Sequence, residues 1–286
     1  MKKYLLLLAE LSKVRITFAV ALTTIAGYLL AKGQFDTGLI LPTIGIFLLA
    51  CGSSALNHYQ DSDKDKLMER TRKRPIPAGR ISKSDVLIIV VVLSVIGSGL
   101  IYIGSDFVGF QLGLLAMIWY NAIYTPLKRK TAFAVIPGSV IGAIPPIVGW
   151  VAGGGSVLDP KALILAFFFF IWQVPHFWLL MLHYGKEYEK AGYPSITRYY
   201  NDTQIRYITF LWTFATAVSA LMIPMFGLTH SKIITLFLLA AVSWLIVVFT
   251  SLLRKQNENY NPFYYFMRIN YFVLAIIVLL SVDPFI

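Results

Sequence analysis

The chain is poor in charge, in acidic side chains and in cysteine. Of its 286 residues only 14% are charged and only 14 are acidic, whereas 57% are hydrophobic and the mean hydropathy is +0.69. So little polar surface excludes a soluble globular domain, and the sequence predicts an integral membrane protein. The single cysteine, Cys51, excludes an internal disulfide, and we interpret it as a small packing residue.

The sequence also lacks a linker, a low-complexity tract or a soluble insertion, so we expect one domain over residues 1–286. Apolar runs follow one another instead, and each is long enough to cross a bilayer, which takes about 17 to 25 residues. Prolines within several runs are tolerated where neighbouring helices pack around them. We predict an all-α, polytopic membrane bundle of about nine transmembrane helices, at residues 16–32, 38–57, 86–104, 107–125, 132–152, 161–182, 205–226, 232–252 and 266–283.

Basic residues gather in alternate loops. If the N-terminus is cytoplasmic, all of the 25 Lys and Arg residues except Lys32, Lys161 and Lys232 fall on the cytoplasmic side. Because cytoplasmic loops retain Lys and Arg, we expect that orientation, in a multi-pass protein of the inner cell membrane. The net charge of +11 then results mainly from membrane topology, and the same basic side chains can also bind anionic ligands. We therefore expect no nucleic-acid partner.

Asn57, Asp61 and Asp65 stand four residues apart where an apolar stretch gives way to a basic one. On an α-helix each step of four turns about 400°, so the three side chains form one polar stripe, while Asp63 points away from it. Hard cations such as Mg²⁺ prefer carboxylate oxygens and share their remaining coordination with phosphate. The stripe therefore predicts a magnesium site at the membrane edge that serves a lipid-soluble diphosphate.

These acidic residues have two other interpretations. A calcium loop of the EF-hand type needs Gly and Glu at its sixth and twelfth positions. Counted from Asp61, those positions hold Lys66 and Arg72, so the calcium loop is excluded. A solvated acidic loop that binds no metal stays open as the alternative to the magnesium site.

Polar clusters follow the second, fourth and sixth predicted helices, which all end on the same side. The first continues into Arg70 and Arg74, the second contains Tyr124 and Lys128, and the third spans residues 172–194. We expect the three clusters to meet over one cavity, where Lys and Arg would neutralise the charge that develops on a diphosphate leaving group. Alternatively, the basic residues only anchor loops at the membrane surface.

His176 lies in an aromatic stretch near the end of the sixth predicted helix. It could bind a metalloporphyrin iron, or it could hydrogen-bond to Gln173 or to a neighbouring helix. Ionisable groups inside a membrane are functional candidates, so His176 stays among the site residues. If the helix continues beyond residue 183, Glu187 points toward the same cavity as Asp61.

These residues resemble the intramembrane aromatic prenyltransferase superfamily of the UbiA type, whose signature N-x-x-x-D-x-x-x-D is met by Asn57, Asp61 and Asp65. Within it, the chain is most similar to the branch that farnesylates heme. The resemblance covers about the first two thirds of the chain, and the last three predicted helices resemble the family by hydropathy alone. The segments that carry it are Lys13–Thr17, Asn57–Arg80, Tyr124–Thr131, Gly142–Trp150, Trp172–Trp178 and Glu187–Pro194.

This resemblance implies transfer of a farnesyl group from farnesyl diphosphate to a vinyl group of heme B, with addition of water and release of diphosphate. It implies Mg²⁺ as the cofactor, held by Asp61, Asp65 and Glu187. It also places Asn57 and Tyr188 in the catalytic set. The side chains that it assigns to substrates are Arg15, Arg70, Arg74, Tyr124 and Lys128 for the diphosphate and His176 for the heme.

The partners implied are farnesyl diphosphate, heme B and membrane lipid, with a heme-modifying enzyme or an oxidase assembly partner accepting the product. The chain departs from the family pattern at Glu187-Tyr188, where heme-modifying members usually have Asp-Tyr, and after Pro194, where Ser-Ile-Thr replaces Met-Leu-Pro. A quinone precursor or another aromatic ring therefore stays open as acceptor. A non-enzymatic transporter or lipid-binding protein is the alternative from a different class. Transporters often place their charges at the bilayer midplane, whereas the acidic candidates here lie at cytoplasmic helix ends.

Overall fold

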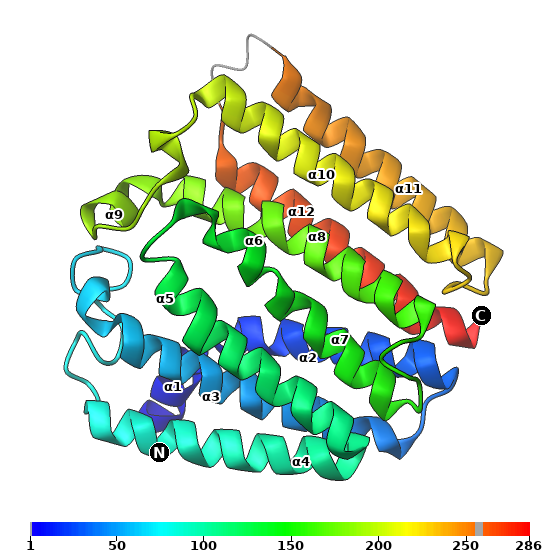
Figure 1. Ribbon diagram of the computed structural model, residues 1–286, viewed down its shortest axis with the longest axis horizontal. Coiled ribbons are helices and arrows are strands. Elements are labelled where there is room, and N and C mark those ends of the chain that lie inside the picture. The colour runs from blue at the N-terminus through cyan, green and yellow to red at the C-terminus, as the bar shows by residue number, and fades with distance from the viewer. Residues whose placement is uncertain (1, 255–259) are drawn as a thin grey trace.

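The computed structural model describes residues 2–254 and 260–286, and all regular structure in these ranges is helical. Long helices lie side by side in one bundle, as Figure 1 shows. The α-helices are α1 (Lys2–Leu11), α2 (Val14–Lys32), α3 (Ile40–Asp65), α4 (Lys83–Ile118), α5 (Thr125–Leu127), α6 (Val135–Gly138), α7 (Val140–Ala152), α8 (Pro160–His183), α9 (Gly185–Lys190), α10 (Asp202–Met225), α11 (Lys232–Thr250) and α12 (Pro262–Val282).

Eight segments of the described chain are long and apolar enough to cross a membrane. One of them, Lys83–Leu127, has 45 residues, about twice what a single crossing needs. At Asp106 within it the backbone is not helical, with φ 69° and ψ −169°, and the chain turns back there (Figure 1). The Asp106 side chain caps the returning helix by accepting from the backbone N–H of Val108 at 2.8 Å. The two halves correspond to the predicted spans 86–104 and 107–125, so the expected multi-pass helical architecture is confirmed.

The connections between helices lie at two opposite ends of the bundle (Figure 1). One end carries the N-terminal α1, the loop of residues 66–82 that follows α3, and the short helices α5 and α9. The other end carries the connections at residues 33–39, 153–159 and 226–231, together with the C-terminus. The three polar clusters expected from the sequence are therefore at the same end.

Helices α2 and α7 cross at very short range through two glycines. A Cβ on Gly27 would lie 1.9 Å from the carbonyl oxygen of Pro146, and a Cβ on Gly149 would lie 1.9 Å from that of Thr24. Lipid supplies no hydrophobic drive for helices to associate, so membrane helices depend on close packing of this kind. Gly149 belongs to Gly142–Trp150, one of the segments that carry the resemblance to the prenyltransferase superfamily. Its place in the close crossing is a structural reason for a glycine there.

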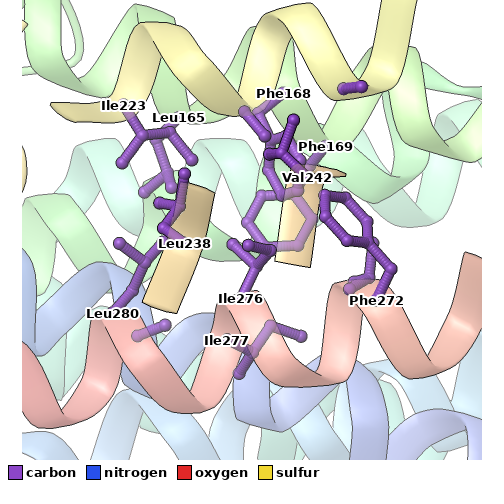
Figure 2. Packing of buried hydrophobic residues seen from close by; sticks show 14 of the residues in the cluster. Leu165, Phe168, Phe169, Ile223, Leu238, Val242, Phe272, Ile276, Ile277 and Leu280 are labelled. Carbon is purple, nitrogen blue, oxygen red and sulfur yellow. The ribbon is translucent and has the colours of Figure 1, made fainter. Parts of the chain in front are cut away.

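The second half of the chain packs around a dense apolar interior. Phe168 of α8 and Phe272 of α12 contact each other edge to face, with ring centres 6.4 Å apart. This packing fixes α8 against α12. Each of these helices also carries a polar side chain of the candidate site, His176 on α8 and Asn270 on α12. Figure 2 shows the interior, which includes Leu165, Phe168, Phe169, Ile223, Leu238, Val242, Phe272, Ile276, Ile277 and Leu280.

Candidate functional site

The polar stripe predicted from residue spacing lies along the last turns of α3. Asn57, Asp61 and Asp65 are all buried, with 2%, 4% and 1% of their surfaces exposed, although they stand at the end of the bundle. The Asp63 side chain is 76% exposed, so it points away from the stripe as the helical spacing predicted. Burial of two carboxylates demands compensating partners, because an unpaired buried charge is very costly.

Asp61 is the point at which the three polar clusters meet. Its carboxylate forms an ion pair with Lys128 and accepts from Arg129 Nη2 at 3.0 Å, both beyond α5. It also accepts from the Tyr193 hydroxyl at 3.4 Å, beyond α9, and from Asn57 Nδ2 at 2.9 Å. One carboxylate therefore collects donors from segments 67 and 132 residues away in the sequence.

Asp65 has a separate cationic partner. Both Asp65 carboxylate oxygens accept from Arg74 Nη1, at 3.0 and 2.8 Å. The Thr71 hydroxyl donates to the Asp65 backbone carbonyl at 3.0 Å, which folds the loop after α3 back over the helix end. Arg74 is thus held at the stripe by the loop that carries it, whereas its neighbour Arg72 is exposed.

Arg70 and Glu187 form a second group next to the stripe. Helix α8 ends at His183 and α9 begins at Gly185, so the chain stays helical across Glu187 with only a short break. The Arg70 backbone N–H donates to Glu187 Oε2 at 3.3 Å, and the Arg70 guanidinium lies 4.4 Å above the centre of the Tyr184 ring. The loop after α3 and helix α9 are therefore in direct contact.

Tyr188 packs beside Tyr193, with ring centres 5.4 Å apart. Burial raises the pKa of the Tyr188 hydroxyl, and nearby Arg70 and Arg74 oppose that effect only in part. Tyr188 is therefore a neutral hydroxyl that can donate to an anionic ligand.

Aromatic rings connect the charged cluster to His176. Lys128 Nζ lies 5.8 Å from the centre of the Tyr124 ring, and Tyr124 stacks on Phe177 with ring centres 5.5 Å apart. Phe177 in turn contacts His176, again with ring centres 5.5 Å apart. Tyr124 ends a π-helical turn at Trp119–Tyr124, a distortion that is frequent at functional sites. The residues predicted for diphosphate and for heme are thus ends of one contiguous set of contacts.

His176 hydrogen-bonds to a neighbouring helix rather than to Gln173. Its Nδ1 lies 2.8 Å from Oδ1 of Asn270 on α12. Of the two hydrogen bonds that the sequence left open, the one between helices is formed, and binding of a porphyrin iron by His176 stays a prediction. Asn270 lies in a span that sequence similarity alone had not connected with the site.

The sequence interpretation missed Lys13, Arg129 and Tyr193 at the stripe. Lys13 Nζ donates to Asn57 Oδ1 at 3.0 Å from the corner between α1 and α2, where its backbone is left-handed at φ 48°. Burial and the nearby Arg74 and Lys128 cations lower the pKa of Lys13 to about 7. Lys13 opens the family-like segment Lys13–Thr17, so a signal for it was present.

Arg15 differs from the other basic residues assigned to the diphosphate. It is exposed, and no hydrogen bond or ion pair among residues 2–254 and 260–286 joins it to the stripe. From this part of the chain, Lys13 is the residue that reaches Asn57.

The donor set fits Mg²⁺ only in company with a phosphate ligand. In the part of the chain that the structure describes, no three His, Cys, Asp or Glu side chains come together as a ready metal site. Magnesium is typically held by one or two carboxylates together with substrate phosphates, and Asp61 and Asp65 supply two carboxylates on one helix face. Each is paired with cations at present, so a metal would have to replace Lys128 and Arg74.

Comparison with known proteins identifies the family. Residues 20–272 match the sequence profile of the UbiA prenyltransferase family. The chain belongs to this family. It is a multi-pass membrane prenyltransferase, and the match extends into α12, beyond the segments whose similarity was evident from motifs.

Curated relatives of this family member are named protoheme IX farnesyltransferase. The one from Geobacter sulfurreducens is 39% identical over 215 residues, covering 75% of this chain and 79% of the relative. The one from Christiangramia forsetii is 34% identical over 228 residues, covering 79% and 75%. The one from Ehrlichia canis is 40% identical over 189 residues, covering 65% and 64%.

Solved structures share the fold at low sequence identity. A structure of digeranylgeranylglyceryl phosphate synthase has a TM-score of 0.79 at 14% identity and covers 99% of both chains. A UbiA homologue from Archaeoglobus fulgidus bound to DMAPP and Mg²⁺ has a TM-score of 0.73 at 11% identity, covering 98% of this chain and 99% of that one. At this identity the likeness establishes the fold.

Proposed function

We propose that this prenyltransferase transfers the farnesyl group of farnesyl diphosphate to a vinyl group of heme B, giving heme O and diphosphate. The observation that carries the proposal is the unbroken set of contacts from the Asp61–Lys128 ion pair through Tyr124 and Phe177 to His176. It puts a charged end suited to diphosphate next to an aromatic region suited to a porphyrin. Relatives named protoheme IX farnesyltransferase, and a homologue binding DMAPP with Mg²⁺, support both halves.

The charged end would bind the leaving group. Asp61 and Asp65 would hold Mg²⁺, with Asn57 orienting Asp61 as it does now, and the metal would supply positive charge to the departing diphosphate. Lys128 and Arg74, once displaced from their carboxylates, would donate to phosphate oxygens with Arg70 and the Tyr188 hydroxyl. Glu187 as a further metal ligand, and Arg15 as a further phosphate ligand, stay predictions.

The aromatic end would shelter the reacting carbons. The bond between C1 of the farnesyl chain and the diphosphate oxygen breaks, and a vinyl carbon of heme forms a bond to C1. Water then adds to the adjacent vinyl carbon and gives up a proton, which balances the reaction. The stacked rings of Tyr124 and Phe177 would keep bulk water from the allylic cation. We place this end of the bundle, with the N-terminus, on the cytoplasmic side.

The direct test is mass spectrometry of heme extracted after purified protein in lipid has been incubated with heme B, farnesyl diphosphate and Mg²⁺. We expect a product that is heavier by one farnesyl group plus one hydroxyl group and that is lost when EDTA removes the metal. Unchanged heme from a folded protein would contradict heme as the acceptor. Transfer to a quinone precursor in its place would support the alternative acceptor.

His176→Ala is expected to weaken heme binding by about tenfold or more while leaving the affinity for farnesyl diphosphate unchanged, because His176 lies at the aromatic end of the site. Absorbance titration with heme and the KM for farnesyl diphosphate measure the two effects separately. His230→Ala is the matched control, since His230 lies in the connection at the opposite end of the bundle. Equal loss of both affinities, or of neither, would assign His176 to packing.

Arg74→Lys is expected to raise the KM for farnesyl diphosphate about tenfold. Lysine keeps the positive charge, so Asp65 stays paired, but it cannot offer the planar guanidinium fork that suits phosphate oxygens. Initial rates at varied farnesyl diphosphate concentration measure the effect. Arg72→Lys is the control, because Arg72 is exposed two residues away, and an equal effect in both variants would contradict the role of Arg74.

A further inference from the structure

His176 on α8 and Asn270 on α12 are joined by a hydrogen bond whose polarity the structure determines. The His176 Nδ1 lies 2.8 Å from Asn270 Oδ1, and Asn270 Nδ2 donates to the Phe266 backbone carbonyl at 2.6 Å. Rotating the amide by 180° would set two oxygen atoms against each other at the Phe266 carbonyl. The Asn270 amide is therefore held with its oxygen toward the imidazole.

This orientation decides which ring nitrogen of His176 carries the proton. An amide oxygen only accepts hydrogen bonds, so Nδ1 of the neutral imidazole must be the donor. The lone pair is then on Nε2. The Phe266 carbonyl fixes the orientation of the Asn270 amide, and the amide oxygen in turn fixes the tautomer of His176. Solvent is not needed for either step.

The surroundings of Nε2 are aromatic, and its lone pair has no hydrogen-bond partner in the described chain. The rings of Trp172, Phe177 and Phe266 lie with their centres 4.9, 5.5 and 5.0 Å from that of His176. Among the described residues no side chain or backbone group hydrogen-bonds to Nε2, and Nε2 is not one of the polar atoms sealed in the interior. His58 shows the contrast, because both of its ring nitrogens are buried and neither has a hydrogen-bond partner in the part of the chain that the structure describes.

We propose that Asn270 is a positioning residue that holds His176 as the Nδ1-protonated tautomer and presents its Nε2 lone pair to the iron of the porphyrin substrate. The inference rests on the proposed function, since it concerns how heme would be held there. A hydrogen bond accepted from Nδ1–H makes Nε2 a better donor to iron, and removal of such outer partners typically weakens metal binding by about 10- to 100-fold. The amide also fixes the plane of the ring, and with it the direction from which iron can bind.

The test compares Asn270→Leu with the wild-type protein loaded with ferrous heme. Leucine keeps the volume of the side chain but cannot accept from Nδ1–H. We expect the iron–histidine stretching band in the resonance Raman spectrum to move to lower frequency and heme affinity to fall about tenfold, with the KM for farnesyl diphosphate unchanged. Ser281→Ala is the control on the same helix, because the Ser281 hydroxyl donates back to the Ile277 carbonyl of its own helix.

A second variant covers the case in which Asn270→Leu does not fold. Asn270→Asp keeps the acceptor and adds charge, so its iron–histidine band is expected to move to higher frequency. The role of Asn270 alone would be overturned if both Asn270 variants kept the wild-type iron–histidine band and heme affinity while His176→Ala lost the band. Conversion of heme by a wild-type protein without an iron–histidine band would overturn the inference and leave the proposed function standing. A wild-type protein that neither binds nor converts heme would overturn both.

Discussion

Asp61→Asn is expected to lower the rate of prenyl transfer on the order of 10³-fold in a protein that still folds. Asp61 is the carboxylate on which Lys128, Arg129 and Tyr193 converge, and asparagine removes the charge that would hold a metal on the diphosphate. Product formation per unit of folded protein, measured by mass spectrometry of extracted heme, gives the effect. Asp65→Ala is expected to lose transfer as well.

Folding should survive the change at Asp61 because one of its partners can give up its charge. Burial lowers the pKa of Lys128, and Asp61 counteracts that effect. Without the carboxylate the pKa falls further, so Lys128 can become neutral rather than stay as an unpaired buried cation. Asp63→Asn is the matched control, since Asp63 lies two residues away on the exposed side of α3. Turnover retained in Asp61→Asn would contradict the metal-binding role.

Gly27→Ala is expected to destabilise the protein by about 3 kcal/mol or more, the upper range for added volume in a packed interior. The new methyl group would lie 1.9 Å from the Pro146 carbonyl oxygen, and a backbone atom cannot rotate out of the way as a side chain can. Helices α2 and α7 would have to separate, and α7 leads to the segment that carries the site. The thermal unfolding midpoint of the detergent-solubilised protein measures the loss.

Gly99→Ala supplies the comparison for this prediction. No heavy atom lies within 4 Å of the position that a Cβ would take on Gly99 of α4. Alanine in an open helical position is more favourable than glycine by about 0.5–1 kcal/mol, so the midpoint should stay or rise slightly. Equal midpoints for the two variants would contradict the close crossing of α2 and α7.

The parts of this protein that sequence predicts are those set by local periodicity. The stripe of Asn57, Asp61 and Asp65 follows from the helical repeat within one segment, and the apolar runs follow from the thickness of the bilayer. The division of one long apolar stretch at Asp106 was also foreseeable, because a single crossing needs only about half its length.

The contacts missed by sequence analysis join residues far apart in the chain. Lys13 and Asn57 are separated by 44 positions, Tyr193 and Asp61 by 132, and His176 and Asn270 by 94. Membrane topology enriches Lys and Arg at this end whether or not they bind a ligand, which obscures the few that do. Only the packing of α12 against α8 distinguishes Asn270 from any other intramembrane amide.

The carboxylates of α3 already have cationic partners within the chain, and this bears on how a catalytic cycle would end. Mg²⁺ and diphosphate, entering together, would exchange with Lys128 and Arg74 instead of filling a vacant charged site. When the prenyl group has left, the re-formed internal pairs would compete with the diphosphate for the same groups. If the proposed function holds, these internal pairs would favour release of the charged product, at a cost in affinity for the substrate.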